Sequence, residues 1–257
     1  DPSRLLIRLW RDRKIYEYGL ARVHRVLAQS AQQQEAMLRN YGRDSTVASM
    51  LVEPAREVRA FEQREFHLLW VSNIRSVKRA DRMLELARAL PGLRARMVGG
   101  AVPGSEALYA QIESEARGVD RLDFAGPMPF DQVPAAFAAA RVFVNTSDVE
   151  GFPNSYLQAW IHGVPVVAYF DPDGVIARRG LGIAVRTPDE LKSAARHLAT
   201  DEAAWRAASE RCLRYMAEEF GEERILAPYL EAFGVPPSME RSAGRVAVSG
   251  SRSSCTT

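Results

Sequence analysis

Short runs of β-branched and aromatic residues alternate with amphipathic stretches between residue 66 and about residue 185. Such runs predict strands, and apolar residues at helical spacing predict helices that cover them. The expected strands are 66–71, 96–98, 121–124, 142–145 and 164–169, and the expected helices between them are 81–90, 105–117, 131–139 and 155–162. This order of elements predicts an α/β fold with a Rossmann-like parallel sheet and helices on both faces.

The pattern becomes wholly helical after residue 185. A typical helix start lies at 187–190, and helices are expected to continue to about Phe233 and to pack on the flank of the sheet. Residues 236–257 are rich in Ser, Gly and Arg and show no periodicity. Because so few apolar side chains cannot offset the entropy lost on ordering, we expect a folded domain over 65–235 and a disordered tail over 236–257.

Residues 1–64 differ from the rest of the chain. They hold two strand candidates, 23–28 and 46–52, around a helical stretch at 31–40. Two strands are too few for a stable sheet, and a complete second α/β domain would need roughly 100 further residues. We therefore interpret 1–64 as the end of an incomplete N-terminal α/β domain of acceptor type, followed by a linker.

Composition narrows the function classes. The formal charge of +2 is too small to indicate nucleic-acid binding, and no apolar run approaches the length of about 18 residues that a membrane-spanning helix needs. The start of the chain does not resemble a signal peptide, and two cysteines support neither a disulfide framework nor a zinc site. We expect a cytoplasmic protein. Basic residues exceed acidic ones in 1–64, which indicates a solvated helix or, alternatively, peripheral association with the inner face of a membrane.

The segment 150–158 is the most informative one. It follows a predicted strand and opens a predicted helix, at the carboxyl edge of the sheet where open α/β folds bind ligands. Asn154 is expected to cap the helix, which would aim the amides of the first turn at an anion such as a diphosphate. Gly151 would allow a ligand to approach the backbone, and Glu150 and Gln158 would bind hydroxyl groups. By spacing alone, an ordinary turn between strand and helix remains the alternative.

A second polar segment, 71–79, follows the first predicted strand of this domain. It contains Asn73, Arg75 and Lys78, and the cations could neutralise a departing diphosphate. A solvated basic turn is the alternative. The next two predicted strands also end in glycine: Gly99 and Gly100 follow the first, and the second ends just before Met128. These glycines could simply terminate the strands.

These segments, together with 158–160 and 163–167, resemble the signature of the large retaining glycosyltransferase family with two Rossmann domains, known as the GT-B fold. The family includes sucrose synthases, trehalose-phosphate synthases and bacterial mannosyltransferases. The resemblance covers residues 66–233 and, more weakly, 15–54. It implies that this chain is the C-terminal, donor-binding half of such an enzyme.

The resemblance also implies roles for individual residues. Glu150 would bind hydroxyls of the donor sugar, and the following backbone would meet sugar and phosphate at Gly151, Phe152, Pro153, Asn154 and Ser155. Gln158 replaces the glutamate that binds the ribose. Lys78 matches the diphosphate-binding lysine, so Glu150 and Lys78 would be the catalytic pair. Asn73 occupies the position of the family's arginine, and Arg75 would supply the guanidinium instead. Loops at Gly99, Gly100 and Met128 would line the nucleotide pocket.

Other candidates for chemistry are weaker. Asp171 and Asp173 flank Pro172 as in an Asp-x-Asp metal motif, but their place after a strand and before Gly174 favours an ordinary turn, so we expect no metal and no cofactor. His24 and His162 are interpreted as residues that compensate helix dipoles. Walker, Gly-x-Gly-x-x-Gly and Gly-x-Ser-x-Gly motifs do not occur in the sequence.

The resemblance therefore predicts transfer of a sugar, with retention of configuration, from a UDP- or GDP-sugar to a glycan, lipid-linked or small-molecule acceptor. The leaving phosphate would accept the acceptor's proton, so that no protein base is needed in this half. Two alternatives stay open. The chain could be a truncated nucleotide-sugar-binding module without transferase activity, or a sugar-nucleotide 2-epimerase whose acid and base carboxylates we do not identify.

Overall fold

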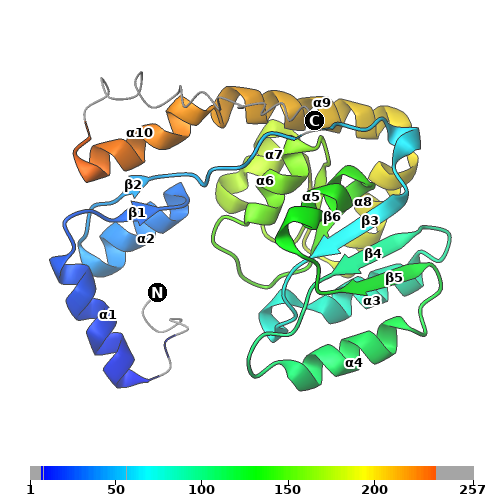
Figure 1. Ribbon diagram of the computed structural model, residues 1–257, viewed down its shortest axis with the longest axis horizontal. Helices are drawn as coiled ribbons and strands as arrows, with labels where there is room; N and C mark the ends of the chain where they lie inside the picture. Colours follow the sequence, from blue (N-terminus) through cyan, green and yellow to red (C-terminus); the bar gives the residue numbers. More distant parts are fainter. Residues whose placement is uncertain (1–6, 8, 56, 236–257) are drawn as a thin grey trace, which may run out of the picture.

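The computed structural model describes residue 7, residues 9–55 and residues 57–235. Two groups of elements are visible in Figure 1: a large sheet with its helices, and a smaller group formed by α1, β1, α2, β2 and α10. The predicted disordered tail, 236–257, lies outside the described residues. Our division into residues 1–64 and 65–235 remains a prediction.

The large sheet has six parallel strands in the order β5-β4-β3-β6-β7-β8. The chain begins at the centre with β3, fills one side, then returns to the centre at β6 and fills the other side. The predicted fold class is confirmed. The strands are β3 (Phe66–Val71), β4 (Ala95–Val98), β5 (Leu122–Gly126), β6 (Ala140–Asn145), β7 (Val166–Ala168) and β8 (Gly182–Ala184).

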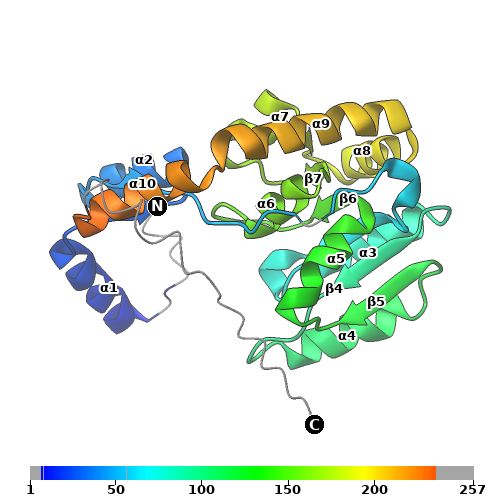
Figure 2. The ribbon, with the colours of Figure 1, turned by 45° about the horizontal axis from the view of Figure 1, so that its top comes forward.

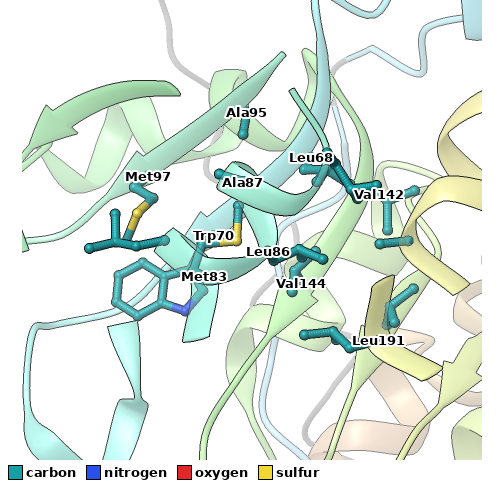
Figure 3. Packing of buried hydrophobic residues seen from close by; sticks show 14 of the residues in the cluster. Leu68, Trp70, Met83, Leu86, Ala87, Ala95, Met97, Val142, Val144 and Leu191 are labelled. Atoms are coloured by element: carbon teal, nitrogen blue, oxygen red, sulfur yellow. The ribbon is translucent and has the colours of Figure 1, made fainter. Parts of the chain in front are cut away.

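Helices cover both faces because the strands are apolar on both sides. On one face, α3 (Ala80–Ala89), α4 (Glu106–Ala116) and α8 (Pro188–Thr200) pack on Leu68, Trp70 and Val142. Figure 3 shows this core, with Met83 and Leu86 of α3 against Trp70 and with Leu191 of α8 near Val144. Each fully buried side chain of this size contributes about 1.5–3 kcal/mol of transfer free energy.

The opposite face carries α5 (Val133–Ala138), α6 (Asn154–Ile161) and α7 (Val175–Arg179). Tyr156 and Trp160 of α6 are fully buried against the sheet, and the Tyr156 ring packs on Phe143. Their polar atoms are satisfied: the Tyr156 hydroxyl donates to the Phe170 carbonyl at 2.8 Å, and the Trp160 indole donates to the Leu181 carbonyl at 3.2 Å. The helix that opens at the carboxyl edge of β6 is therefore rigidly placed.

Some boundaries differ from prediction because of proline. The expected helix 131–139 is a 3-10 turn, η4 (Phe130–Gln132), followed by the short α5, with Pro134 in the first turn of α5. The expected strand 164–169 pairs with its neighbours only from Val166, because Pro165 lacks an amide hydrogen. The Pro165 carbonyl still accepts a hydrogen bond from the Phe143 amide at 3.0 Å.

The C-terminal helices do not all lie on the flank of the sheet, as we had expected. Helix α8 packs on the sheet, and α9 (Glu202–Glu219) packs on α6 and α8. Helix α10 (Glu222–Phe233) instead leaves the sheet and lies beside α2 and β2, as Figures 1 and 2 both show. The Tyr229 hydroxyl donates to the Ser49 carbonyl at 3.0 Å. The flank prediction is therefore wrong for α10.

The N-terminal group is α1 (Trp10–Arg22), β1 (Leu27–Ala28), α2 (Ala31–Tyr41) and β2 (Thr46–Val47). Its strands pair in parallel and are much shorter than the predicted 23–28 and 46–52, since each strand has only the other as a partner. At the start of α2, Ser30 caps the helix by accepting from the Gln33 amide, and at its end Gly42 adopts a left-handed conformation.

The segment between β2 and β3 crosses from the small group to the large sheet (Figure 1) and ends in a buried anchor. The 3-10 turn η2 (Phe61–Gln63) precedes Arg64, which is 3% exposed and donates to the carbonyls of Ala140 and His162 at 2.7 and 2.8 Å. Burial lowers the pKa of the Arg64 guanidinium to about 10. Arg64 therefore fixes the end of the linker to the six-stranded domain.

Within the described ranges, the helices are either too short or too polar to cross a membrane.

Candidate functional site

A cavity of about 280 Å³ opens at the carboxyl ends of β3 and β6. These two strands are adjacent at the centre of the sheet, and the chain leaves them in opposite directions, which is the point where open α/β sheets bind ligands. Residues from three parts of the chain line it: Gln29, Val71, Ser72, Lys78, Asn145, Glu150, Gly151, Phe152, Pro153, Asn154 and Ser155.

The loops after β3 and β6 are tied together below the cavity. The Thr146 hydroxyl donates to the Lys78 carbonyl at 2.8 Å and accepts from the Trp70 indole at 2.9 Å. The amide of Asp148 donates to the Val77 carbonyl at 2.9 Å. Because these contacts hold both loops against the core, the two sides of the cavity are positioned before any ligand arrives.

Lys78 and Glu150, the predicted catalytic pair, meet in this cavity. The Lys78 Nζ lies 2.7 Å from each carboxylate oxygen of Glu150, and the two side chains are 19% and 10% exposed. Lys78 ends the 3-10 turn η3 (Ser76–Lys78), and Glu150 lies in the loop between β6 and α6. The two opposite charges therefore neutralise each other.

Asn145 is a site residue that the sequence analysis did not identify. It is the buried last residue of β6, and its Nδ2 donates to Glu150 Oε1 at 3.3 Å while its Oδ1 accepts from the Ser147 amide at 2.9 Å. Asn145 thus orients the carboxylate of Glu150. A polar residue at the carboxyl end of an otherwise apolar strand was the signal that could have found it.

The predicted helix cap at Asn154 is wrong. Pro153 occupies the N-cap position of α6 with an extended backbone, and its carbonyl accepts a hydrogen bond from the Tyr156 amide at 3.0 Å. Asn154 is the first helical residue and is exposed. Asn154 and Ser155 both line the cavity. The first amides of a helix have no partner within it, so this end of α6 can still bind an anion.

Gly151 and Phe152, in the loop between β6 and α6, contact two other parts of the chain. The Phe152 ring packs edge-on against Trp160 of α6, with ring centroids 6.3 Å apart. A Cβ at Gly151 would lie 2.9 Å from Gln29 Oε1 and 2.8 Å from Gln33 Nε2. Gly151 thus lies in close contact with the side-chain ends of two glutamines of the N-terminal group. Gln29 itself lines the cavity, and nothing in the local sequence indicated this.

The remaining predicted site residues lie outside the cavity lining. Asn73 and Arg75 are exposed in the loop after β3, and Arg75 is the N-cap residue of η3. Met128 and Gln158 are also absent from the residues that line the cavity in the described structure. The nucleotide-binding roles of these four residues remain predictions.

Gly99 and Gly100 also lie outside the lining, and the structure gives them a packing role. A Cβ at Gly99 would lie 1.8 Å from the Ser72 carbonyl oxygen, and one at Gly100 would lie 3.0 Å from Cβ of Pro127. The Gly100 carbonyl accepts from the Ile74 amide at 2.9 Å. These glycines therefore allow the loops after β3, β4 and β5 to approach one another. Their predicted contact with the nucleotide is untested.

Two other predictions concern residues away from the cavity. Pro172–Gly174 form a 3-10 turn, η5, as expected for a turn, and the Asp171 and Asp173 carboxylates accept hydrogen bonds from different helices. The described part of the chain contains no cluster of three or more acidic, His or Cys residues suited to a metal. His162 ends α6, and burial lowers its pKa, so it is neutral near pH 7 and does not compensate the dipole as a cation.

The sheet order and the cavity at its switch point define a Rossmann-like domain of the GT-B glycosyltransferase type. A comparison with protein-family models matches residues 65–201, more than half of the chain, to the family described as "Glycosyl transferases group 1". The chain belongs to this family. A comparison with curated protein sequences gave no match.

Several solved structures share the fold. A variant of TarM from S. aureus, in complex with UDP, superposes with a TM-score of 0.73 at 16% identity, over 87% of this chain and 46% of TarM. The pneumococcal O-GlcNAc transferase GtfA, in complex with UDP and GlcNAc, gives 0.65 at 18% identity, over 86% of this chain and 47% of GtfA. HepE from Anabaena, in complex with UDP-glucose, gives 0.66 at 14% identity, over 86% and 66%.

These identities establish the fold alone. The chain spans about half the length of TarM and GtfA and 66% of HepE.

Proposed function

We propose that this chain binds a nucleotide diphosphate sugar in the cavity between β3 and β6 and belongs to an enzyme that transfers the sugar to an acceptor with retention of configuration. One observation carries the proposal: Lys78 and Glu150 meet at 2.7 Å at the switch point of the sheet, beside the first turn of α6. The cation and the helix N-terminus suit the diphosphate of such a donor, and the carboxylate suits the hydroxyl groups of its sugar.

The diphosphate would lie against Lys78 and the first amides of α6. Negative charge grows on the leaving diphosphate as the bond to the sugar breaks. Pre-positioned cations and N–H groups stabilise this growing charge more than they stabilise the intact nucleotide sugar. Lys78 supplies a point charge, and the amides of Asn154 and Ser155 supply fixed dipoles. Because Thr146 and Val77 hold the loops in place, these groups need little rearrangement.

The sugar would lie on the Glu150 side of the cavity. The carboxylate accepts hydrogen bonds from hydroxyl groups, and Asn145 holds it in place through Nδ2. Glu150 would then orient the sugar so that the acceptor attacks from the face of the leaving phosphate. That phosphate would take the acceptor's proton, as the family resemblance implies, and no base from this chain is required.

The structural relatives support a UDP-sugar donor and a glycan acceptor. TarM and GtfA are in complex with UDP, GtfA also with GlcNAc, and HepE with UDP-glucose. A GDP-sugar remains the alternative donor, and a lipid-linked or small-molecule acceptor the alternative acceptor. Peripheral association with a membrane remains a prediction, because the basic residues next to the exposed Trp10 in α1 pair with Asp12 and Glu17.

A second candidate function is a nucleotide-sugar-binding module without transferase activity. It is favoured by the coverage of the relatives, because less than half of TarM and of GtfA is matched by this chain. Such a module would bind a nucleotide diphosphate and turn nothing over.

Calorimetric titration of the chain with UDP, GDP and ADP, followed by UDP-glucose or the matching GDP-sugar, tests both candidates. Saturable binding of one nucleotide that is lost in Lys78→Ala, but kept in Lys192→Ala on α8, supports the site. Release of the nucleotide from its sugar in the presence of an acceptor then indicates a transferase, and binding without release indicates the module. Absence of binding by every nucleotide would sink the proposal.

A further inference from the structure

The turn after β7 is held by its own first residue. The Asp171 carboxylate accepts hydrogen bonds from the amides of Ile176 and Ala177 at 2.8 and 3.1 Å, which fixes the turn to the start of α7. Asp173 follows with φ of 52°, a left-handed conformation that is uncommon outside glycine and that Asp tolerates better than most residues. The turn is thus rigid, and Asp173 stands at its tip.

The Asp173 carboxylate contacts a helix that lies far away in the sequence. Its Oδ2 accepts from the Ala31 amide at 2.8 Å and its Oδ1 from the Gln32 amide at 2.9 Å, both in the first turn of α2. These amides have no partner within the helix, and a negative charge at a helix N-terminus is favourable. Asp173 therefore joins the N-terminal group to the domain with the six-stranded sheet.

Two glutamines lie at the same end of α2: Gln29 just before its cap and Gln33 in its first turn. The Gln33 side-chain oxygen accepts from the Gln29 amide at 2.8 Å, and both side chains lie against Gly151, where even a Cβ would be within 2.9 Å of their polar ends. Gln29 lines the cavity together with Lys78 and Glu150. The position of Gln29 thus depends on how the start of α2 is docked.

We infer that Asp173 is a positioning residue that docks the start of α2 beside the Gly151 loop, and that the Gln29 side chain so placed contacts the sugar of the donor. The inference rests on the proposed function. A primary amide both donates and accepts hydrogen bonds without charge, which suits sugar hydroxyls better than phosphate oxygens. Gln29 also lies against Gly151, the residue that follows Glu150, and the sugar is expected beside Glu150.

The test compares Gln29→Ala and Asp173→Asn with matched controls in the full chain. Gln111→Ala removes an exposed glutamine side chain of α4, and Asp189→Asn changes an exposed acid in the first turn of α8. Asn tolerates the left-handed conformation, so Asp173→Asn keeps the turn. Calorimetry with UDP and UDP-glucose, or with the GDP pair if the wild type binds GDP, gives two dissociation constants for each variant.

We expect both test variants to bind the nucleotide sugar about tenfold more weakly, which corresponds to about 1.4 kcal/mol, and to bind the free nucleotide within about twofold of wild type. Both controls should match wild type for both ligands. Because Asp173 acts through Gln29, the double variant should lose no more than the larger single loss, whereas independent effects would add. A Gln29→Ala chain that discriminates sugar from free nucleotide as well as wild type would overturn the role of Gln29.

Amide hydrogen exchange tests the docking without a ligand. The amides of Ala31 and Gln32 should exchange faster in Asp173→Asn than in wild type or Asp189→Asn, and unchanged exchange would overturn the positioning role of Asp173. A wild-type chain that binds no nucleotide would remove the proposed function and the role of Gln29 with it. The exchange measurement would still decide the role of Asp173.

Discussion

Replacing Glu150 with glutamine should change the affinities for the free nucleotide and for the nucleotide sugar in opposite directions. Glu150 contacts the Lys78 ammonium at 2.7 Å through both of its oxygens. A free nucleoside diphosphate must share Lys78 with this carboxylate and gains nothing from it. A nucleotide sugar faces the same competition but uses the carboxylate to bind hydroxyl groups.

The magnitudes follow from the geometry of the pair. A phosphate oxygen bound to Lys78 Nζ would lie within about 6 Å of the Glu150 carboxylate, because each charge-assisted hydrogen bond is about 2.8 Å long. At an effective dielectric constant of about 20 the repulsion at this separation is about 3 kcal/mol. Since the side chains are 19% and 10% exposed, solvent screens part of it, and we expect a net gain near 1 kcal/mol, or about fivefold, for the free nucleotide.

The nucleotide sugar should show the opposite result. Loss of hydrogen bonds from hydroxyls to a charged acceptor costs about 1.5–3 kcal/mol, which outweighs the relief of repulsion. Calorimetry on wild type, Glu150→Gln and the control Glu85→Gln, an exposed acid on α3, measures both effects. If Glu150→Gln weakens both ligands equally, or changes neither, then Glu150 does not divide the cavity between phosphate and sugar as proposed.

Three further predictions use other parts of the structure. Lys78→Ala should weaken free UDP or GDP by about 1.5–3 kcal/mol in calorimetry, because a charge-assisted hydrogen bond is lost, and equal affinity would exclude Lys78 from the phosphate site. Gly99→Ala should lower the free energy of unfolding in urea by more than about 3 kcal/mol, since its Cβ would lie 1.8 Å from the Ser72 carbonyl oxygen, whereas Gly92→Ala, with open space around it, should stay within about 0.5 kcal/mol. Burial lowers the pKa of His162, so below its unfolded pKa of about 6.5 the unfolded chain binds more protons than the folded one. Stability should therefore fall from pH 7 to pH 5, less steeply in His162→Asn, and identical slopes would contradict the lowered pKa.

The sequence predicted best what depends on neighbouring residues. The strands at the centre of the sheet are runs such as 66–71 and 142–145, which are apolar enough to be buried on both faces, and the structure places them there as β3 and β6. The cavity was expected at the carboxyl edge after Asn145, and it lies there. Lys78 and Glu150 can pair because β3 and β6 are neighbours in the sheet. The order of the strands in the sheet determines this neighbourhood, and the hydrophobic pattern of each strand does not reveal it.

The errors arose where distant parts of the chain meet. Asn154 is of a residue type that often caps helices. Pro153 occupies the N-cap position instead, because its fixed φ suits the extended residue before a helix. Helix α10 has an apolar stripe like α8, and no local signal shows that its partner is the N-terminal group. Gln29 reaches the cavity where it lies against Gly151, and Asp173 holds the start of the helix that follows Gln29; both partners are more than 100 residues away in the sequence.

The charges in the cavity indicate which groups would balance the charge of a bound diphosphate. Of the described residues that line it, Lys78 and Glu150 are charged, and their charges cancel. A nucleoside diphosphate brings at least two negative charges, so Lys78 alone leaves an excess that the α6 amides must balance. Arg75 lies three residues before Lys78, is exposed in the loop and does not line the cavity. The contacts of Thr146 hold the loop that carries Lys78. On the proposed function, we therefore expect the amides at the start of α6 to supply the rest of the charge balance beside Lys78.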